Sequence, residues 1–245
     1  MSLTKVLFTQ EGVIEHLISH CPLIEDLNIG HCYVYNHGHL VKSLFLHGLQ
    51  KLKKVDLRII QQVHIDSPNL ENLSYEHLVM DAAFKLNFNH CTNLICLRLK
   101  SIVIAEKWLL KLLSNKFPFL ESLELCDCSL PDERINIISA QLKVLKLYQY
   151  SNLKEVNINV PNLKSLLYEG YEKPVISFMR SSNQLQASVI TGVDYWRLYS
   201  LRDFIRNIPK KILASLSLFV IRPILGDPRK IPAMQVFSNT PPVAS

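Results

Sequence analysis

The chain has 245 residues, of which 48% are hydrophobic and 20% are charged, and its formal net charge is +6. This composition excludes an intrinsically disordered chain, which would lack the apolar residues needed to bury a core. The first residues lack the apolar run of a signal peptide, and no stretch of about 18 apolar residues suggests a membrane span. We therefore expect a cytoplasmic or nuclear protein that does not bind a membrane.

An apolar register, L-x-x-L-x-L, recurs along the chain and predicts one short strand at each occurrence. It is found at residues 24–29, 41–46, 52–57, 60–65, 70–75, 94–99, 120–125, 142–147, 153–158, 163–168 and 213–218. This register is typical of leucine-rich repeats, whose stacked units share one core. The sequence predicts an α/β fold: a leucine-rich repeat solenoid (horseshoe) with a parallel concave sheet and mixed helical and irregular convex returns.

A longer internal repeat supports this interpretation. Residues 21–32 match 117–128 at an offset of 96, and residues 63–77 match 156–170 at an offset of 93. Helical spacing of apolar residues at 12–22, 106–118 and 194–209 precedes a strand in each copy. We expect super-repeats at 10–105 and 106–190 and a degenerate copy at 191–220, which together form a leucine-rich repeat domain over 1–220. Residues 221–245 hold 5 of the 12 prolines and predict a weakly ordered tail.

The candidate binding residues follow from the strand pattern. The fourth and sixth positions of each register point into the core, so the residues beside them point out onto the concave face. These outward residues mix acidic, basic and neutral groups, which disfavours nucleic acid and favours a protein target. The candidates are Asp26, Asn28, Phe45, Lys54, Asp56, Gln62, His64, Asn72, Arg98, Glu124, Lys146, Glu155 and Asn157.

The cysteines and histidines give only weak support for a metal site. The six cysteines form no C-x-x-C pair, and Cys32 and Cys128 each fall where the repeat consensus uses Asn or Cys to satisfy backbone groups after a strand. His31, Cys32, His37 and His39 are the most metal-like cluster, but they fall in a loop between repeats. Since no catalytic motif is found either, we expect no metal, no cofactor and no enzymatic activity.

The net positive charge of the chain arises entirely from its last third. Residues 1–169 hold 17 basic and 17 acidic side chains, whereas residues 170–245 hold 10 basic and 4 acidic ones. A basic helical face there would suit RNA, lipid or an acidic partner. We favour a solvated helix surface, and nucleic-acid binding is the less favoured alternative. The residues concerned are Arg197, Arg202, Arg206, Lys210 and Lys211.

Four segments carry a family resemblance: HLISHCPLIEDLNIGHC, LQKLKKVDLR, VHIDSPNLENLSYEH and FPFLESLELCDC. They resemble the leucine-rich region of plant F-box/LRR proteins, and the likeness extends over residues 10–220. In that family the F-box recruits the Skp adaptor of an SCF ubiquitin ligase, and the repeats select the protein to be ubiquitinated. The resemblance implies a substrate-recognition module that lacks its own F-box, so a Skp-type adaptor is implied only with an F-box upstream. The alternative is a stand-alone interaction scaffold, a competitor or a non-functional truncated copy.

Overall fold

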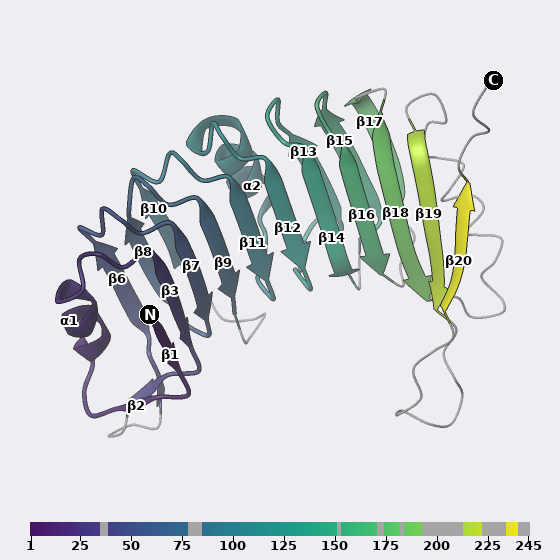
Figure 1. Ribbon diagram of the computed structural model, residues 1–245. Coiled ribbons are helices and arrows are strands. Elements are labelled where there is room, and N and C mark those ends of the chain that lie inside the picture. Colours follow the sequence, from purple (N-terminus) through teal and green to yellow (C-terminus); the bar gives the residue numbers. More distant parts are fainter. Residues whose placement is uncertain are drawn as a thin grey trace, which may run out of the picture. The chain divides into compact units, whose positions relative to one another are not determined.

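The computed structural model describes residues 1–34, 39–77, 85–150, 153–170, 174–181, 184–192, 213–221 and 234–239. Short strands dominate these ranges, as Figure 1 shows. The chain divides into two compact units. Unit 1 comprises Met1–Val103 and Asn115–Leu120, and unit 2 comprises Ile104–Ser114 and Glu121–Ser245.

Unit 1 contains one large parallel sheet and two small sheets. The large sheet has the order β1 (Ser2–Thr4), β3 (Asp26–Gly30), β7 (Lys54–Arg58), β9 (Asn72–Glu76) and β11 (Cys96–Lys100). A second parallel sheet has β8 (Gln62–Asp66) between β6 (Ser43–His47) and β10 (Lys85–Asn89). The third sheet joins β2 (Leu7–Phe8), β4 (Tyr33–Val34) and β5 (His39–Leu40). The helix α1 (Val13–Ser19) contacts β6.

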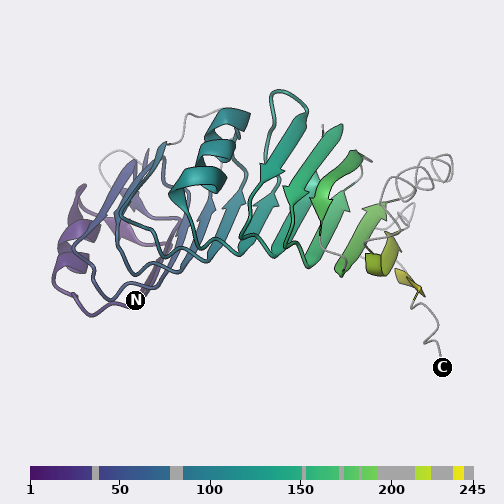
Figure 2. The same cartoon turned by 90° about the horizontal axis from the view of Figure 1, so that it is seen from above.

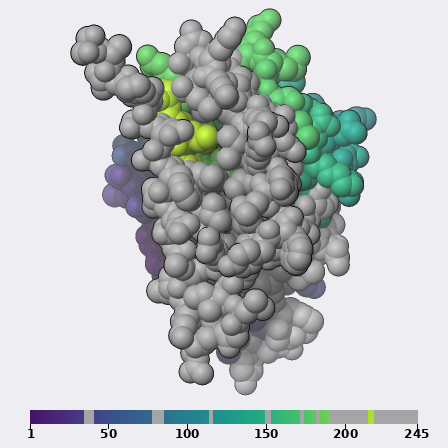
Figure 3. Space-filling model, turned by 90° about the vertical axis from the view of Figure 1, so that its right-hand side faces the viewer, coloured from purple at the N-terminus to yellow at the C-terminus, as the bar shows by residue number. Residues whose placement is uncertain are grey.

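Unit 2 repeats this organisation. Its large sheet has the order β12 (Ser122–Cys126), β14 (Val144–Tyr150), β16 (Ser165–Gly170), β18 (Leu185–Gly192) and β19 (Leu213–Ile221), and then β20 (Met234–Asn239), which is antiparallel to β19. Its second sheet has β15 (Glu155–Val160) between β13 (Arg134–Ile138) and β17 (Val175–Ser181). The helix α2 (Glu106–Lys111), which continues as a π-helical segment at Leu112–Lys116, contacts β13. Figure 2 shows the strands from above, and Figure 3 looks at unit 2 from the side of β19.

The core of each unit is built from the apolar positions of the register. In unit 1 the residues Leu27, Val55, Leu73 and Leu97 occupy the same register position on β3, β7, β9 and β11, and all four are buried. Their neighbours along each strand point the other way and remain partly exposed, as expected for a pleated strand. All of the strands predicted from the sequence are present, so the leucine-rich repeat solenoid is confirmed.

The segments that connect one large-sheet strand to the next differ from the expected mixture of helical and irregular returns. The registers at 41–46, 60–65 and 153–158 do not belong to the large sheets, because they form β6, β8 and β15 of the second sheets. Along most of the chain, a strand of the large sheet is followed by a strand of the second sheet. Two strands that begin about ten residues apart therefore belong to different sheets, on opposite sides of the core. Within the described ranges, most of the segments that connect the strands of a large sheet therefore contain a second-sheet strand, and the helices α1 and α2 lie in two of the other connecting segments.

Several residues that directly follow large-sheet strands have a left-handed backbone conformation. His31, Ile59, Ser101 and Asp127 directly follow β3, β7, β11 and β12, and each has a positive φ between 50° and 64°. A positive φ reverses the course of the backbone and costs free energy for a residue other than glycine, above all for a β-branched one such as Ile59. The recurrence of this conformation after four of the strands indicates that the turn geometry itself is part of the repeat.

The last third of the chain is described only in part. The helix expected at 194–209 lies outside the described residues, whereas the strand expected after it is β19. Within the expected tail at 221–245, residues Met234–Asn239 form β20 and pair with β19, for example Ser238 with Ser217. The sequence MQVFSN has no strict period-two pattern, because Val236 and Phe237 are adjacent apolar residues, so this strand could not be predicted from alternation.

Candidate protein-binding face

The outward side chains of the unit 1 large sheet form an ordered polar surface, which we call the unit 1 face. Strand register aligns these side chains in rows that cross β3, β7, β9 and β11. Neighbouring strands lie about 4.8 Å apart, so the side chains within a row are close enough to interact. The rows are Asp26, Lys54, Asn72 and Cys96; Asn28, Asp56, Ser74 and Arg98; and Arg58, Glu76 and Lys100, where Gly30 of β3 contributes no side chain.

Ion pairs organise one end of the unit 1 face. The guanidinium of Arg58 lies 2.9 Å from the carboxylate of Asp56, and the ammonium of Lys100 lies 2.6 Å from that of Glu76. The hydrogen bond with Asp56 and the charge of Asp56 raise the pKa of Arg58. Partly exposed pairs of this kind stabilise the fold by only about 0–1 kcal/mol. Their main effect is to hold charges of both signs at fixed positions on the surface.

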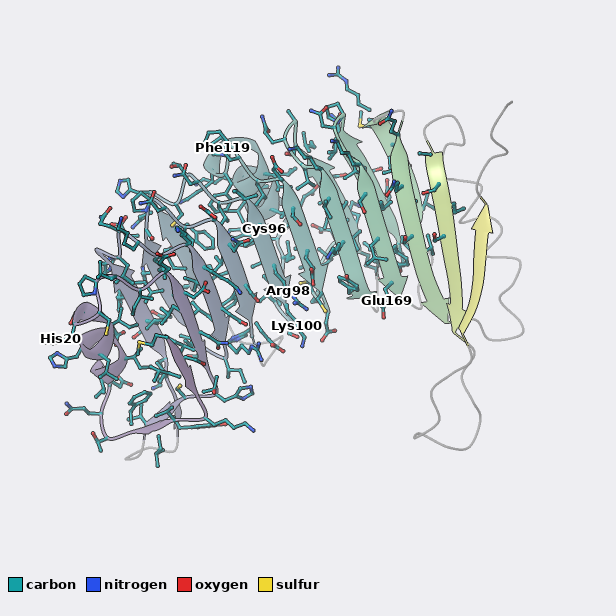
Figure 4. All side chains as sticks on the ribbon, in the orientation of Figure 1. His20, Cys96, Arg98, Lys100, Phe119 and Glu169 are labelled. Carbon is teal, nitrogen blue, oxygen red and sulfur yellow. The ribbon has the colours of Figure 1, made fainter. Side chains whose placement is uncertain are left out.

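The structure places most of the sequence-predicted residues on the large sheets. Asp26, Asn28, Lys54, Asp56, Asn72 and Arg98 lie on the unit 1 face, and Figure 4 shows Cys96, Arg98 and Lys100 in succession along β11. Glu124 and Lys146 lie next to each other on β12 and β14 of unit 2, with 3.6 Å between the charged groups.

Five candidates were assigned to the wrong sheet. Phe45, Gln62 and His64 lie on the second sheet of unit 1, and Glu155 and Asn157 lie on the second sheet of unit 2. The alternation of side chains separates inward from outward positions on a strand, but it does not identify the sheet to which the strand belongs. These five residues therefore do not contribute to the large-sheet faces.

Several outward residues of the large sheets were not among the residues predicted from the sequence. Arg58, Glu76 and Lys100 lie one position beyond the sixth register position, where the same alternation would have found them. In unit 2 the missed residues are less polar and include Val144, Tyr148 and Leu167, which lie on β14 and β16 and are partly exposed. Among the residues that the structure describes, the outward side chains of the unit 2 large sheet thus carry fewer charges than the unit 1 face.

An aromatic cluster lies on the second sheet of unit 1. The rings of Phe45 and His64 stack with their centroids 4.6 Å apart and their planes at 11°, and His47 stacks on Phe45 at 6.1 Å. The side-chain amide of Asn87 lies 3.1 Å from Nδ1 of His64. Phe45 nevertheless remains 44% exposed. We call Phe45, His47 and His64 the Phe45 cluster.

The cysteines after the strands have the role that the sequence predicts. Cys32 Sγ lies 3.5 Å from the carbonyl oxygen of Leu3 and 3.6 Å from that of Gly30, and Cys128 Sγ lies 3.3 Å from that of Cys126. Burial raises the pKa of the Cys32 thiol, so the neutral form that donates to a carbonyl is favoured. These thiols satisfy backbone oxygens in the turns, as expected.

The other candidate sites are only partly covered by the structure. Among the residues that the structure describes, no three His, Cys, Asp or Glu side chains are placed to hold a metal ion. His37 lies outside the described residues, as do Arg197, Arg202, Arg206, Lys210 and Lys211. Within the described ranges, neither helix has the length and apolar content needed to cross a bilayer.

Comparison with known proteins agrees with the repeat architecture. Residues 80–224, which are more than half of the chain, match the family model described as At1g61320/AtMIF1, LRR domain. No curated protein and no solved structure matches the chain. Leucine-rich repeat domains are in general protein-interaction modules, whose stacked repeats create extended binding surfaces. The chain belongs to the At1g61320/AtMIF1 leucine-rich repeat domain family.

Proposed function

We propose that the chain binds a protein partner through the outward side chains of its large sheets, and that it acts by binding rather than by catalysis. The observation that carries this proposal is the unit 1 face, where register aligns polar and charged side chains in rows across four strands. A surface of fixed charges and amides selects a partner by complementary charge and hydrogen bonding. Solenoids use extended sheet surfaces of this kind for recognition.

The charge pattern favours a protein over a nucleic acid. Nucleic-acid binding requires clustered basic side chains that neutralise phosphates. On the unit 1 face, Arg58 and Lys100 are paired with Asp56 and Glu76, which reduces the positive charge that a phosphate would meet. A protein surface that itself carries both signs is the better match.

We propose further that the chain corresponds to the substrate-recognition part of an SCF-type ubiquitin ligase subunit. The support is the resemblance of four of its segments to plant F-box/LRR proteins. The alternative is a stand-alone scaffold, a competitor or a non-functional truncated copy, and the family match to a leucine-rich repeat domain alone is equally compatible with it.

A matched pair of variants tests protein binding. Ser74→Arg places a bulky cation in the middle row of the unit 1 face, next to Asp56 and Arg98. Asn89→Arg places the same side chain at an exposed position of the second sheet. Affinity-tagged chains are expressed in cells, and the co-purified proteins are quantified. We expect Ser74→Arg to lose proteins that the wild type and Asn89→Arg retain, and equal recovery by both variants would contradict the proposal.

The half-life of a partner found in this way separates the two roles. If the chain selects substrates for a ligase, removal of the chain lengthens the half-life of the partner. A scaffold leaves the half-life unchanged, and a competitor shortens it when the chain is removed. An unchanged or shortened half-life would therefore contradict the ligase role without affecting protein binding.

A further inference from the structure

A cavity of about 440 Å³ opens between the start of α1 and the strand β6 in unit 1. Its apolar floor is formed by Phe8, Ile14, Val34 and Val41, which are all buried. It does not involve the unit 1 face, since its residues come from α1, the second sheet, the third sheet and the segments between them.

Phe45 of the Phe45 cluster also lines this cavity and is held in place there. Its backbone N–H donates a hydrogen bond of 3.3 Å to Oε1 of Glu15, and its ring is stacked on His64. His64 in turn lies within hydrogen-bond distance of Asn87. An exposed aromatic ring fixed in this way loses little conformational entropy on binding, which is a property of interaction hot spots.

The rim of the cavity has a net negative charge. Glu11 precedes α1 and Glu15 lies in its first turn, and Lys42 is the basic residue that lines the cavity. Nothing lies within 4 Å of the position that a Cβ of Gly12 would occupy, so the backbone of this cavity-lining residue is uncovered. A cationic group with an apolar stem complements an acidic rim over an apolar floor.

We propose that this cavity binds an arginine side chain of a partner protein. The methylene groups would pack on Ile14, Val34 and Val41, and the guanidinium would pair with Glu15 and stack on the ring of Phe45. Arginine is favoured over lysine because its planar guanidinium stacks on aromatic rings and forms paired hydrogen bonds with carboxylates. This second site is independent of the proposed function, so either proposal can fail alone.

The test uses two small probes on the full chain, N-acetylarginine N-methylamide and its uncharged isostere N-acetylcitrulline N-methylamide. Methyl NMR spectra of the chain are recorded during titration with each probe. We expect the arginine probe to shift the methyl signals of Ile14, Val34 and Val41 in a saturable manner. The citrulline probe should bind at least about tenfold more weakly, because it lacks the charge that pairs with the carboxylates.

A conservative variant distinguishes specific binding in the cavity from nonspecific attraction of the cationic probe to the protein. Glu15→Gln removes the charge but keeps a side-chain oxygen that can accept the hydrogen bond from Phe45. We expect it to weaken binding of the arginine probe about fivefold or more, whereas Glu25→Gln, which removes an exposed carboxylate paired with Lys53, leaves binding unchanged. Equal binding of both probes, an absence of shifts at the cavity methyl groups, or full affinity of Glu15→Gln would each overturn the proposal.

Discussion

The side-chain amide of Asn69 donates a hydrogen bond of 2.7 Å to the carbonyl oxygen of Gln50, which belongs to the preceding coil of unit 1. Unit 2 contains the same bond, since Asn162 donates to the carbonyl oxygen of Ala140 at 2.7 Å. Both asparagines follow a proline and precede the first leucine of a register. The asparagine of the recurring Pro-Asn-Leu sequence therefore connects successive turns of the solenoid through a hydrogen bond.

Replacement of either asparagine by alanine should weaken the fold modestly. Asn69→Ala and Asn162→Ala each leave one backbone carbonyl without this donor, and we expect the free energy of unfolding to fall by about 1 kcal/mol. Urea denaturation followed by circular dichroism measures the change. Asn89→Ala, at an exposed position of β10, is the control and should have little effect. Equal losses for all three variants would show that the bond has no specific role.

Truncation of a core leucine should have a much larger effect. Leu123 on β12 is fully buried, and Leu123→Ala removes packing and leaves a cavity. We expect a loss of about 2–5 kcal/mol in the free energy of unfolding. Ser122→Ala changes the adjacent outward side chain and should cost less than about 0.5 kcal/mol. A near-zero effect of Leu123→Ala in the same denaturation experiment would contradict the register.

Gly170 illustrates a close approach that requires the absence of a side chain. A Cβ at this position would lie 2.7 Å from the hydroxyl oxygen of the buried Tyr168. We expect Gly170→Ala to cost about 1–3 kcal/mol through overpacking.

A double-mutant cycle checks the origin of this cost. Tyr168→Phe removes the hydroxyl group, so the double variant Tyr168→Phe/Gly170→Ala should be more stable than the sum of the single changes predicts. Strict additivity of the two free-energy changes would show that the hydroxyl group is not the cause.

The thiols should differ in reactivity with iodoacetamide. Burial raises the pKa of Cys32 and Cys91, so a smaller fraction of each is in the reactive thiolate form at pH 8 than in an unfolded chain. Cys21 is exposed. We expect mass spectrometry to find Cys21 alkylated first in the native chain, and Cys32 and Cys91 to react quickly only after unfolding. Native alkylation of Cys32 at the rate of Cys21 would contradict its buried position.

The sequence was sufficient to predict the solenoid and the strands with a complete register, but not every strand. In β10 the buried residues Leu86 and Phe88 fit the pattern, yet Ala83 stands where the first leucine is expected. In β13 the residues Ile135 and Ile137 are buried in the same way without that first leucine. Two apolar residues in alternation are too common in a chain with 48% hydrophobic residues to identify a strand.

The binding surfaces were less predictable than the fold. The outward positions of β3 and β7 could be predicted from the alternation of side chains. The position of Phe45 and His64 on the second sheet could not, because it depends on which of the two sheets each strand joins. The cavity beside Phe45 could not be predicted, because its floor brings together Phe8, Ile14 and Val34 from separate elements. Local sequence patterns do not encode such contacts.

The most direct test of protein binding is site-specific photo-crosslinking in cells. A benzoylphenylalanine residue is placed at position 74 of the unit 1 face in one chain and at position 89 of the second sheet in another, and cross-linked proteins are identified by mass spectrometry. If the unit 1 face binds a protein, a defined partner cross-links to position 74 and not to position 89. Cross-linking of the same proteins at both positions, or of none at position 74, would contradict binding at this face.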